Sequence, residues 1–285
     1  MSGLIKSSLI LSFARVTNYA LLLVSPILLV RILDPVSFGQ YREFIAYAML
    51  ITSLGAFNIK SNILYFVPRD RDNTETYISH TTLMALAGSV IVCFLLWLFR
   101  DLIVANTNLN FLLPLIVYVA LFLNVDFITD YWLAEKQPKY VMYFTLVRTA
   151  VRLSGVIGVA IVTQDVLTMI YALCAVEALR VLIVLVLMRR IGILSWKWNP
   201  PLLREQLVFV LPLAVSGSMH HVHQHIGQIV VSAQLGVVAL AIYTIAKYQV
   251  PVLNIVRGAI GDSIFPDMVR QAAAAEGDRL ALWKR

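Results

Sequence analysis

The sequence predicts an all-α protein that crosses a membrane several times. Of its 285 residues, 60% are apolar and only 14% are charged, whereas a soluble domain carries about 25% charged residues. The mean hydropathy is +0.80. Apolar runs of about 20 residues, enough to cross ~30 Å of hydrocarbon, recur along almost the whole chain. We therefore expect a polytopic membrane protein with about eight transmembrane helices and no inserted soluble domain.

The apolar runs place each expected span between short polar turns. The eight spans are 8–32, 42–67, 81–99, 109–133, 139–163, 166–188, 205–234 and 238–264. The first lacks a small-residue cleavage site, so we interpret it as a retained helix and not as a signal peptide. The longest breaks are 68–80 and 192–201. Helices usually stop before proline, so Pro200 and Pro201 indicate a seam between two lobes.

The cysteines and the charged residues give no support to a cysteine-based site or to nucleic-acid binding. Cys93 and Cys174 both fall inside apolar spans, so neither a disulfide framework nor a cysteine metal site is expected. The net charge of +7 is distributed by membrane side and gives no reason to expect a nucleic-acid partner.

The Lys and Arg residues predict the orientation, because cytoplasmic loops of membrane proteins are enriched in them. With the N-terminus inside, only Arg31, Arg42 and Arg100 lie in outer loops. The cytoplasmic segments then hold Lys6, Arg69, Arg71, Lys136, Lys139, Arg189, Arg190, Lys197, Arg204, Arg270, Arg279, Lys284 and Arg285. We expect both the N-terminus and the C-terminal tail in the cytoplasm.

The chain contains a weak internal sequence similarity. Residues 30–50 resemble residues 231–251, with Leu33 over Leu235 and Tyr41 over Tyr243. Both helix pairs run in the same direction across the membrane, which favours a transporter with two parallel lobes. Chance similarity between apolar helices is the alternative.

The same segments resemble a known family. RILDPVSFGQYREF is similar to the first outer loop of the polysaccharide flippases, where a leucine-proline step precedes Phe-Gly-x-Tyr. LGVVALAIYTIAKYQVPVLNIVRGAIGDSIFPDMVRQ resembles their second-lobe signature. These proteins belong to the multidrug, oligosaccharidyl-lipid and polysaccharide exporter superfamily, and their members have two lobes of six helices.

The resemblance implies a division of the chain. Residues 1–191 would form a six-helix first lobe, 192–204 a cytoplasmic link, and 205–265 the first two helices of a second lobe. Residues 266–285 look like a cytoplasmic amphipathic tail leading toward a ninth helix, so we expect a chain shorter than its relatives.

The resemblance also implies a function. It suggests a flippase of the bacterial inner membrane that moves an undecaprenyl-diphosphate-linked oligosaccharide for export of O-antigen, capsule or exopolysaccharide. No cofactor or enzymatic activity is implied; membrane lipids and a polysaccharide polymerase or ligase are possible partners. Two alternatives stay open. A polymerase or ligase would need a sizeable outer loop, and an exporter of cationic drugs would need an excess of buried acid.

Charged residues inside the spans are the candidate site, because each costs about 2.5–3.5 kcal/mol at the bilayer centre unless it faces protein or water. Arg148 and Arg152 lie four residues apart on one face of a span. Either they bind phosphate, which guanidinium groups hold in bidentate fashion, or they form a structural network with Glu177 and Arg180. Further basic candidates for substrate binding are Arg15, Lys60 and Lys247, and the candidates for ion coupling are Asp126, Asp130 and Glu177.

A cluster of histidines lies in the seventh expected span, in the stretch MHHVHQHIGQ at 219–228. His221 and His225 share a helical face with Gln228. A metal site lacks a nearby acid or cysteine to complete its shell, so we expect none. Proton coupling, helix packing and a polar cavity wall that binds water or sugar hydroxyls remain, and we favour the cavity wall.

Overall fold

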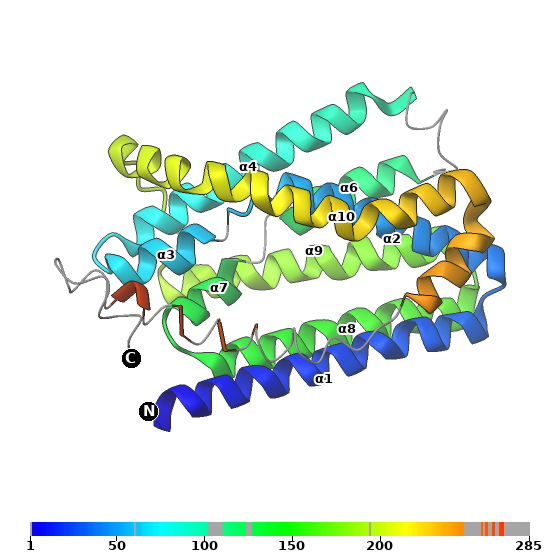
Figure 1. Ribbon diagram of the computed structural model, residues 1–285, viewed down its shortest axis with the longest axis horizontal. Coiled ribbons are helices and arrows are strands. Elements are labelled where there is room, and N and C mark those ends of the chain that lie inside the picture. Colours follow the sequence, from blue (N-terminus) through cyan, green and yellow to red (C-terminus); the bar gives the residue numbers. More distant parts are fainter. Residues whose placement is uncertain are drawn as a thin grey trace.

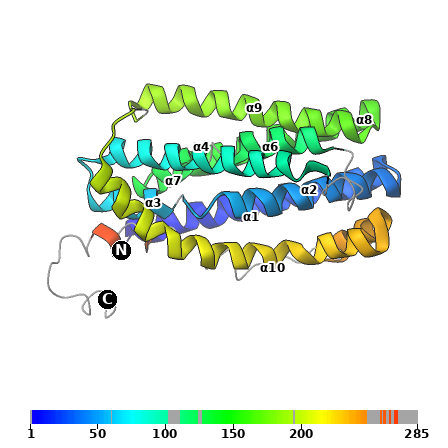
Figure 2. The ribbon, with the colours of Figure 1, turned by 90° about the horizontal axis from the view of Figure 1, so that it is seen from above.

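A computed structural model describes residues 2–59, 61–101, 111–123, 127–193, 195–247, 258, 260–261, 264–265 and 268–270. Within these residues every regular element is a helix. The helices are α1 (Ser2–Ile32), α2 (Pro35–Gly55), α3 (Ser61–Arg69), α4 (Thr74–Leu98), α6 (Leu112–Leu123), α7 (Phe127–Ala134), α8 (Pro138–Thr163), α9 (Val166–Ile191) and α10 (Pro200–Ala246). The long helices lie lengthwise beside one another (Figures 1 and 2). The all-α prediction is confirmed.

Six helical segments of the described chain are long and apolar enough to span a membrane. They are Ser7–Ile32, Thr74–Leu98, Leu112–Ala134, Pro138–Thr163, Val166–Ile191 and Pro200–Ala246. Large apolar side chains cover their outer faces, as for Val90 and Val162, which are 68% and 82% exposed. An outward apolar surface is what a lipid solvent requires. The protein is therefore a multi-pass membrane protein, although six segments do not establish the predicted number of about eight.

The second expected span, 42–67, is wrong as a single helix. The chain forms α2 and α3 there, with a break in which Phe57 and Asn58 have φ values of 43° and 52°. Asparagine adopts this left-handed region more easily than most residues. Residues 55–62 read GAFNIKSN, so glycine and polar residues mark the break within an otherwise apolar run, and the prediction of one continuous span did not take them into account.

Two predicted boundaries are also corrected. Helix α2 begins at Pro35 and not at 42, because the Asp34 carboxylate accepts hydrogen bonds from the backbone N–H groups of Val36 (2.9 Å) and Ser37 (3.1 Å). This is an N-cap followed by proline at the first helical position. Helix α4 begins at Thr74 and not at 81, since its first turns are buried against neighbouring helices and not in a solvated loop.

A break inside α10 falls at Gly236, between the seventh and eighth expected spans. Its φ of 85° interrupts α10, in a region of backbone conformation that glycine enters without steric cost. The carbonyl oxygen of the next residue, Val237, lies where a Cβ on Gly39 would be. Helices α2 and α10 run along each other, and Phe38 and Tyr41 are buried beside this contact. The Phe-Gly-x-Tyr motif thus has a packing role.

Two apolar clusters fix the other helices. One joins α2, α6 and α9 and includes the fully buried side chains of Phe44, Tyr118 and Met169; the second joins α3, α4 and α7 around Ile63, Ile78 and Ile128. Helix α8 packs between α9 and α1, which lie on its two sides (Figure 1). This arrangement brings α8 and its arginines toward the interior of the bundle.

Polar contacts hold the start of α10 and the preceding link against α4. The Nδ1 atom of His80 lies 2.9 Å from Oε1 of Gln206, and the backbone N–H of Asn199 donates to His80 Nε2 at 3.1 Å. His80 is 1% exposed, so these contacts satisfy both nitrogens of a buried ring. The ion pair Lys197–Glu75 at 2.8 Å adds a third contact. The link is therefore fixed to the first six expected spans.

Candidate functional site

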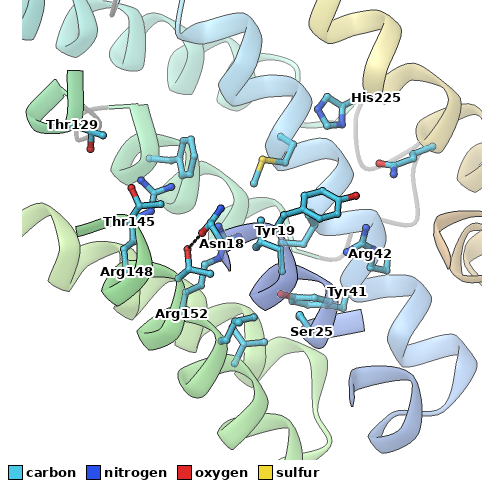
Figure 3. A pocket seen from close by; sticks show the side chains of 18 of the residues that line it. Asn18, Tyr19, Ser25, Tyr41, Arg42, Thr129, Thr145, Arg148, Arg152 and His225 are labelled. Carbon is cyan, nitrogen blue, oxygen red and sulfur yellow. Dashed lines mark hydrogen bonds between the residues drawn. The ribbon is translucent and has the colours of Figure 1, made fainter. Parts of the chain in front are cut away.

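A polar cavity of about 570 Å³ lies among α1, α2, α8 and α10, with α6 and α7 closing one side. Figure 3 shows side chains from these helices converging on it. Its polar lining consists of Asn18, Tyr19, Ser25, Tyr41, Arg42, Thr129, Asp130, Thr145, Arg148, Thr149, Arg152, His225 and Gln228. A volume of this size suits a small ligand or part of a larger one.

The charge of the cavity lining is positive. Three of its side chains are arginines, Arg42 from α2 and Arg148 and Arg152 from α8, against the single carboxylate of Asp130. The two α8 arginines lie one helical turn apart and both line the cavity (Figure 3). Guanidinium groups present forked donors that match phosphate and carboxylate oxygens, so this lining is suited to an anion.

Arg152 also belongs to a buried ion network. Its Nη1 lies 4.0 Å from Oε1 of Glu177, and its Nη2 donates to the Tyr118 hydroxyl at 3.2 Å. The nearer partner of Glu177 is Arg180, whose Nε is 2.7 Å from Oε2. Glu177 and Arg180 are both at least 95% buried, whereas the side chain of Arg152 is 18% exposed. Arg152 therefore lies at the boundary between the network and the cavity.

The structure divides the predicted site residues into groups. Arg148, Arg152, Asp130, His225 and Gln228 come together on the cavity. Glu177 lies behind Arg152, as described above. Lys60, Asp126 and the side chain of His221 lie outside what the structure describes.

Two basic residues of the predicted set lie elsewhere. Lys247 is not part of the cavity lining: its Nζ donates to the backbone carbonyl of Gln224 at 2.6 Å. The Arg15 guanidinium lies against Gly258, and it too does not line the cavity. Hydropathy and charge predicted their depth in the membrane but not which way they point.

The sequence interpretation missed several cavity residues. Arg42 was assigned to an outer loop, but it lies in α2 beside Tyr41 and lines the cavity. The Asp34–Pro35 cap was the signal that could have extended α2 over this position. Asn18 was also missed; its Oδ1 accepts a hydrogen bond of 2.5 Å from the Thr149 hydroxyl, which ties α1 to α8.

The histidine stretch contributes one described side chain to the cavity, His225, while His223 is exposed on α10. Within the described residues, no group of three His, Cys, Asp or Glu side chains is placed to hold a metal ion. On the same cavity, His225 and Gln228 add polar groups that can exchange hydrogen bonds with water or hydroxyls.

Fold and site together define a multi-pass helical membrane protein with a polar, positively charged cavity between its helices. The sequence pattern of the family described as polysaccharide biosynthesis protein matches residues 4–271. The chain belongs to this family, which is that of the polysaccharide and O-antigen flippases. Its members are generally transporters and not enzymes. No curated protein and no solved structure matches the chain.

Proposed function

We propose that this protein is a flippase for an undecaprenyl-diphosphate-linked oligosaccharide in the bacterial inner membrane. It would move this lipid from the inner to the outer leaflet for export of O-antigen, capsule or exopolysaccharide. The observation that carries the proposal is the convergence of Arg42, Arg148 and Arg152 on one cavity in a chain of a polysaccharide biosynthesis family. A lipid-linked diphosphate supplies the anion that this lining suits.

The cavity provides a role for each part of such a substrate. The arginines would bind the diphosphate, since charge-assisted contacts are stronger in a site shielded from bulk water. The amides and ring of Asn18, Gln228 and His225 would face sugar hydroxyls. The lipid tail would remain in the bilayer. Asp130, the acid of the cavity lining, is the ion-coupling candidate that is best placed to respond to the substrate charge.

The membrane arrangement belongs to the same proposal. Helices α1 to α9 would form the first lobe, and the two parts of α10 on either side of Gly236 would begin the second. Arg69, Arg71, Lys136, Lys139, Arg189, Arg190, Lys197 and Arg204 lie at or beside the helix ends on the side where α1 begins (Figure 1). By the bias of basic residues toward the cytoplasm, this end and the N-terminus face inward.

The charge of the cavity argues against a cationic cargo. A site that collects drug cations needs an excess of carboxylates, whereas the lining here has three arginines for one aspartate. The substrate class of the multidrug branch of the superfamily is therefore not supported by this site.

The test is flipping by purified protein in liposomes that contain an undecaprenyl-diphosphate oligosaccharide in both leaflets. A glycosidase added outside removes only the outer half of the sugar when the lipid cannot cross. With an active flippase, nearly all of the sugar becomes accessible. Folded protein that leaves the protected half intact, with and without an imposed proton or sodium gradient, would contradict the proposal.

A further inference from the structure

A second hollow, on the outer surface of the bundle, has a different chemistry. This groove, about 590 Å³ in volume, is lined by aromatic residues of α7 and α8 and closed by Leu187 and Ile191 of α9. Trp132 forms its floor: the indole is buried, stacks on Tyr140 with ring centroids 5.7 Å apart, and meets Phe144 edge-on at 5.6 Å. The groove shares no lining residue with the cavity described above.

The outer wall of the groove faces the lipid. Tyr140 and Tyr143 are 59% and 62% exposed, and Val147, one turn further along α8, is 60% exposed. The groove lies where α8 begins and α9 ends (Figure 1), which is the water-facing end of both helices. Tyrosine and tryptophan are enriched at this depth, where an apolar ring and a polar tip meet both environments.

Basic side chains flank the groove at that same end. Lys139 lies four residues before Tyr143 on α8, and Arg190 lies three residues after Leu187 on α9, so helical spacing places each on the side of a lining residue. Both are exposed, and no described acidic side chain pairs with either. The nearby carboxylate of Glu135 is engaged by Arg71 at 3.0 Å and Arg270 at 3.9 Å. The net charge at the rim is therefore positive.

We propose that this groove binds one anionic phospholipid. An acyl chain lies along the aromatic wall over Trp132, and the phosphate lies between Lys139 and Arg190. The side-chain amide of Gln137, which lines the same end, can donate to the headgroup. The proposal goes beyond the proposed function and does not depend on it, because neither the cavity nor any transported substrate takes part.

The charge of the rim commits the site to an anionic headgroup. Any lipid can fill an aromatic groove, but each basic residue near a membrane surface favours an anionic lipid by about fivefold. Two such residues predict a preference of up to about 25-fold for phosphatidylglycerol over phosphatidylcholine. A merely annular contact predicts no preference.

Trp132 is a built-in reporter for the experiment. In the full chain with Trp97, Trp196, Trp198 and Trp283 replaced by phenylalanine, its fluorescence is measured in bilayers doped with either phosphatidylglycerol or phosphatidylcholine carrying brominated acyl chains. We expect stronger quenching by the anionic lipid at equal mole fraction. Should that variant fail to fold, the native chain and its Trp132→Phe variant give the same quantity as a difference.

Charge reversal decides the origin of any preference. Lys139→Glu combined with Arg190→Glu should bring quenching by the two lipids to the same level, while Arg204→Glu, on the exposed start of α10, should leave the preference intact. If the two brominated lipids quench Trp132 fluorescence equally in the protein with Lys139 and Arg190 unchanged, the proposal is overturned. A preference that survives the double reversal, or that disappears equally in the Arg204→Glu control, would overturn it as well.

Discussion

Ser232 on α10 donates a hydrogen bond of 2.6 Å to the carboxyl group of Glu43 on α2. Both residues are buried, with exposures of 1% and 3%, and no basic side chain in the described chain forms an ion pair with Glu43. The bond joins the two helices that flank the contact between Gly39 and Val237. It is thus a specific polar link between the expected first lobe and the start of the second.

Removing the donor should loosen this link. We expect Ser232→Ala to lower the free energy of unfolding by about 0.6 kcal/mol, the average for interhelical hydrogen bonds in membranes, and by no more than about 1.7 kcal/mol, the largest value found for them. Glu43→Gln should cost less, because the amide oxygen still accepts from Ser232. Thermal unfolding of purified protein in detergent is the measurement, with Ser216→Ala, an exposed serine of the same helix, as the control. An equal midpoint for both serine variants would contradict the expectation.

The glycine of the Phe-Gly-x-Tyr motif, Gly39, allows the close contact between α2 and α10 to be tested. Gly39→Ala places a methyl group on the backbone carbonyl of Val237, and a backbone atom yields less easily than the end of a flexible side chain. We expect a loss of folded protein, seen as a broadened or aggregated peak in size-exclusion chromatography.

The matched control for this substitution is Gly158→Ala on α8. Nothing lies within 4 Å of a Cβ at that position, and alanine is the better helix former by about 1 kcal/mol. The control should accumulate at least as well as the unmodified protein. If Gly39→Ala and Gly158→Ala give the same size-exclusion profile, the close contact between α2 and α10 at Gly39 is contradicted.

Apolar runs predicted most of the fold because a membrane helix must satisfy its backbone internally and present apolar side chains outward. The average hydropathy of 42–67 hid the break at Phe57 and Asn58, although the polar residues from Asn58 to Asn62 mark it locally. Hydropathy also placed the start of α4 too late, because polar residues such as His80 are buried by hydrogen bonds and not by hydrophobicity.

For the candidate site, the spacing of residues along a helix predicted which side chains share a face, but the depth of a residue in its expected span did not predict whether its side chain lines the cavity. Arg148 and Arg152 share a face because they are four apart, and both reach the cavity. Lys247 has a similar character in the sequence, yet its ammonium folds back onto the Gln224 carbonyl. Which of several basic residues face one cavity depends on the packing of α1, α2, α8 and α10, and that information is not local.

The orientation can be tested with reporter fusions at the turns between helices. Reporters joined after Asp34 and after Asp165 should be active only in the periplasm. Those joined after Asp72 and after Lys197 should be active only in the cytoplasm, since α3, α4, α9 and α10 meet these turns. Inverted activity at any two positions would contradict both the topology and the assignment of the basic end to the cytoplasm.

The histidines should not hold a tightly bound metal. We expect well below one equivalent of zinc or iron in purified protein by elemental mass spectrometry, because a zinc site needs at least three protein ligands and the described residues contain no group of three His, Cys, Asp or Glu side chains placed to hold a metal ion. A stoichiometric metal that disappears when His221 and His225 are both replaced by alanine would show that the cavity wall is a metal site.

The arginines of α8 and α9 allow substrate binding to be separated from structural support. Arg180→Ala removes the near partner of Glu177, and a stranded buried charge costs roughly 3–5 kcal/mol, so the amount of folded protein should fall. Adding Glu177→Gln removes the stranded charge and should restore it. Membrane abundance measured by quantitative immunoblot checks both steps.

Arg148→Ala should behave differently, because it removes positive charge from a cavity that already has an excess. We expect normal abundance with most of the flipping activity lost, and partial activity in Arg148→Lys, since lysine binds phosphate as a point charge without the fork geometry.

Arg152 combines the positions of Arg148 and Arg180: it lines the cavity, and its guanidinium lies 4.0 Å from the carboxylate of Glu177. If it acts on substrate, Arg152→Ala combined with Glu177→Gln remains inactive in the liposome assay even at normal abundance. If it only supports α8 against α9, the same double variant recovers both abundance and flipping, and Arg152 then has no role in binding the diphosphate.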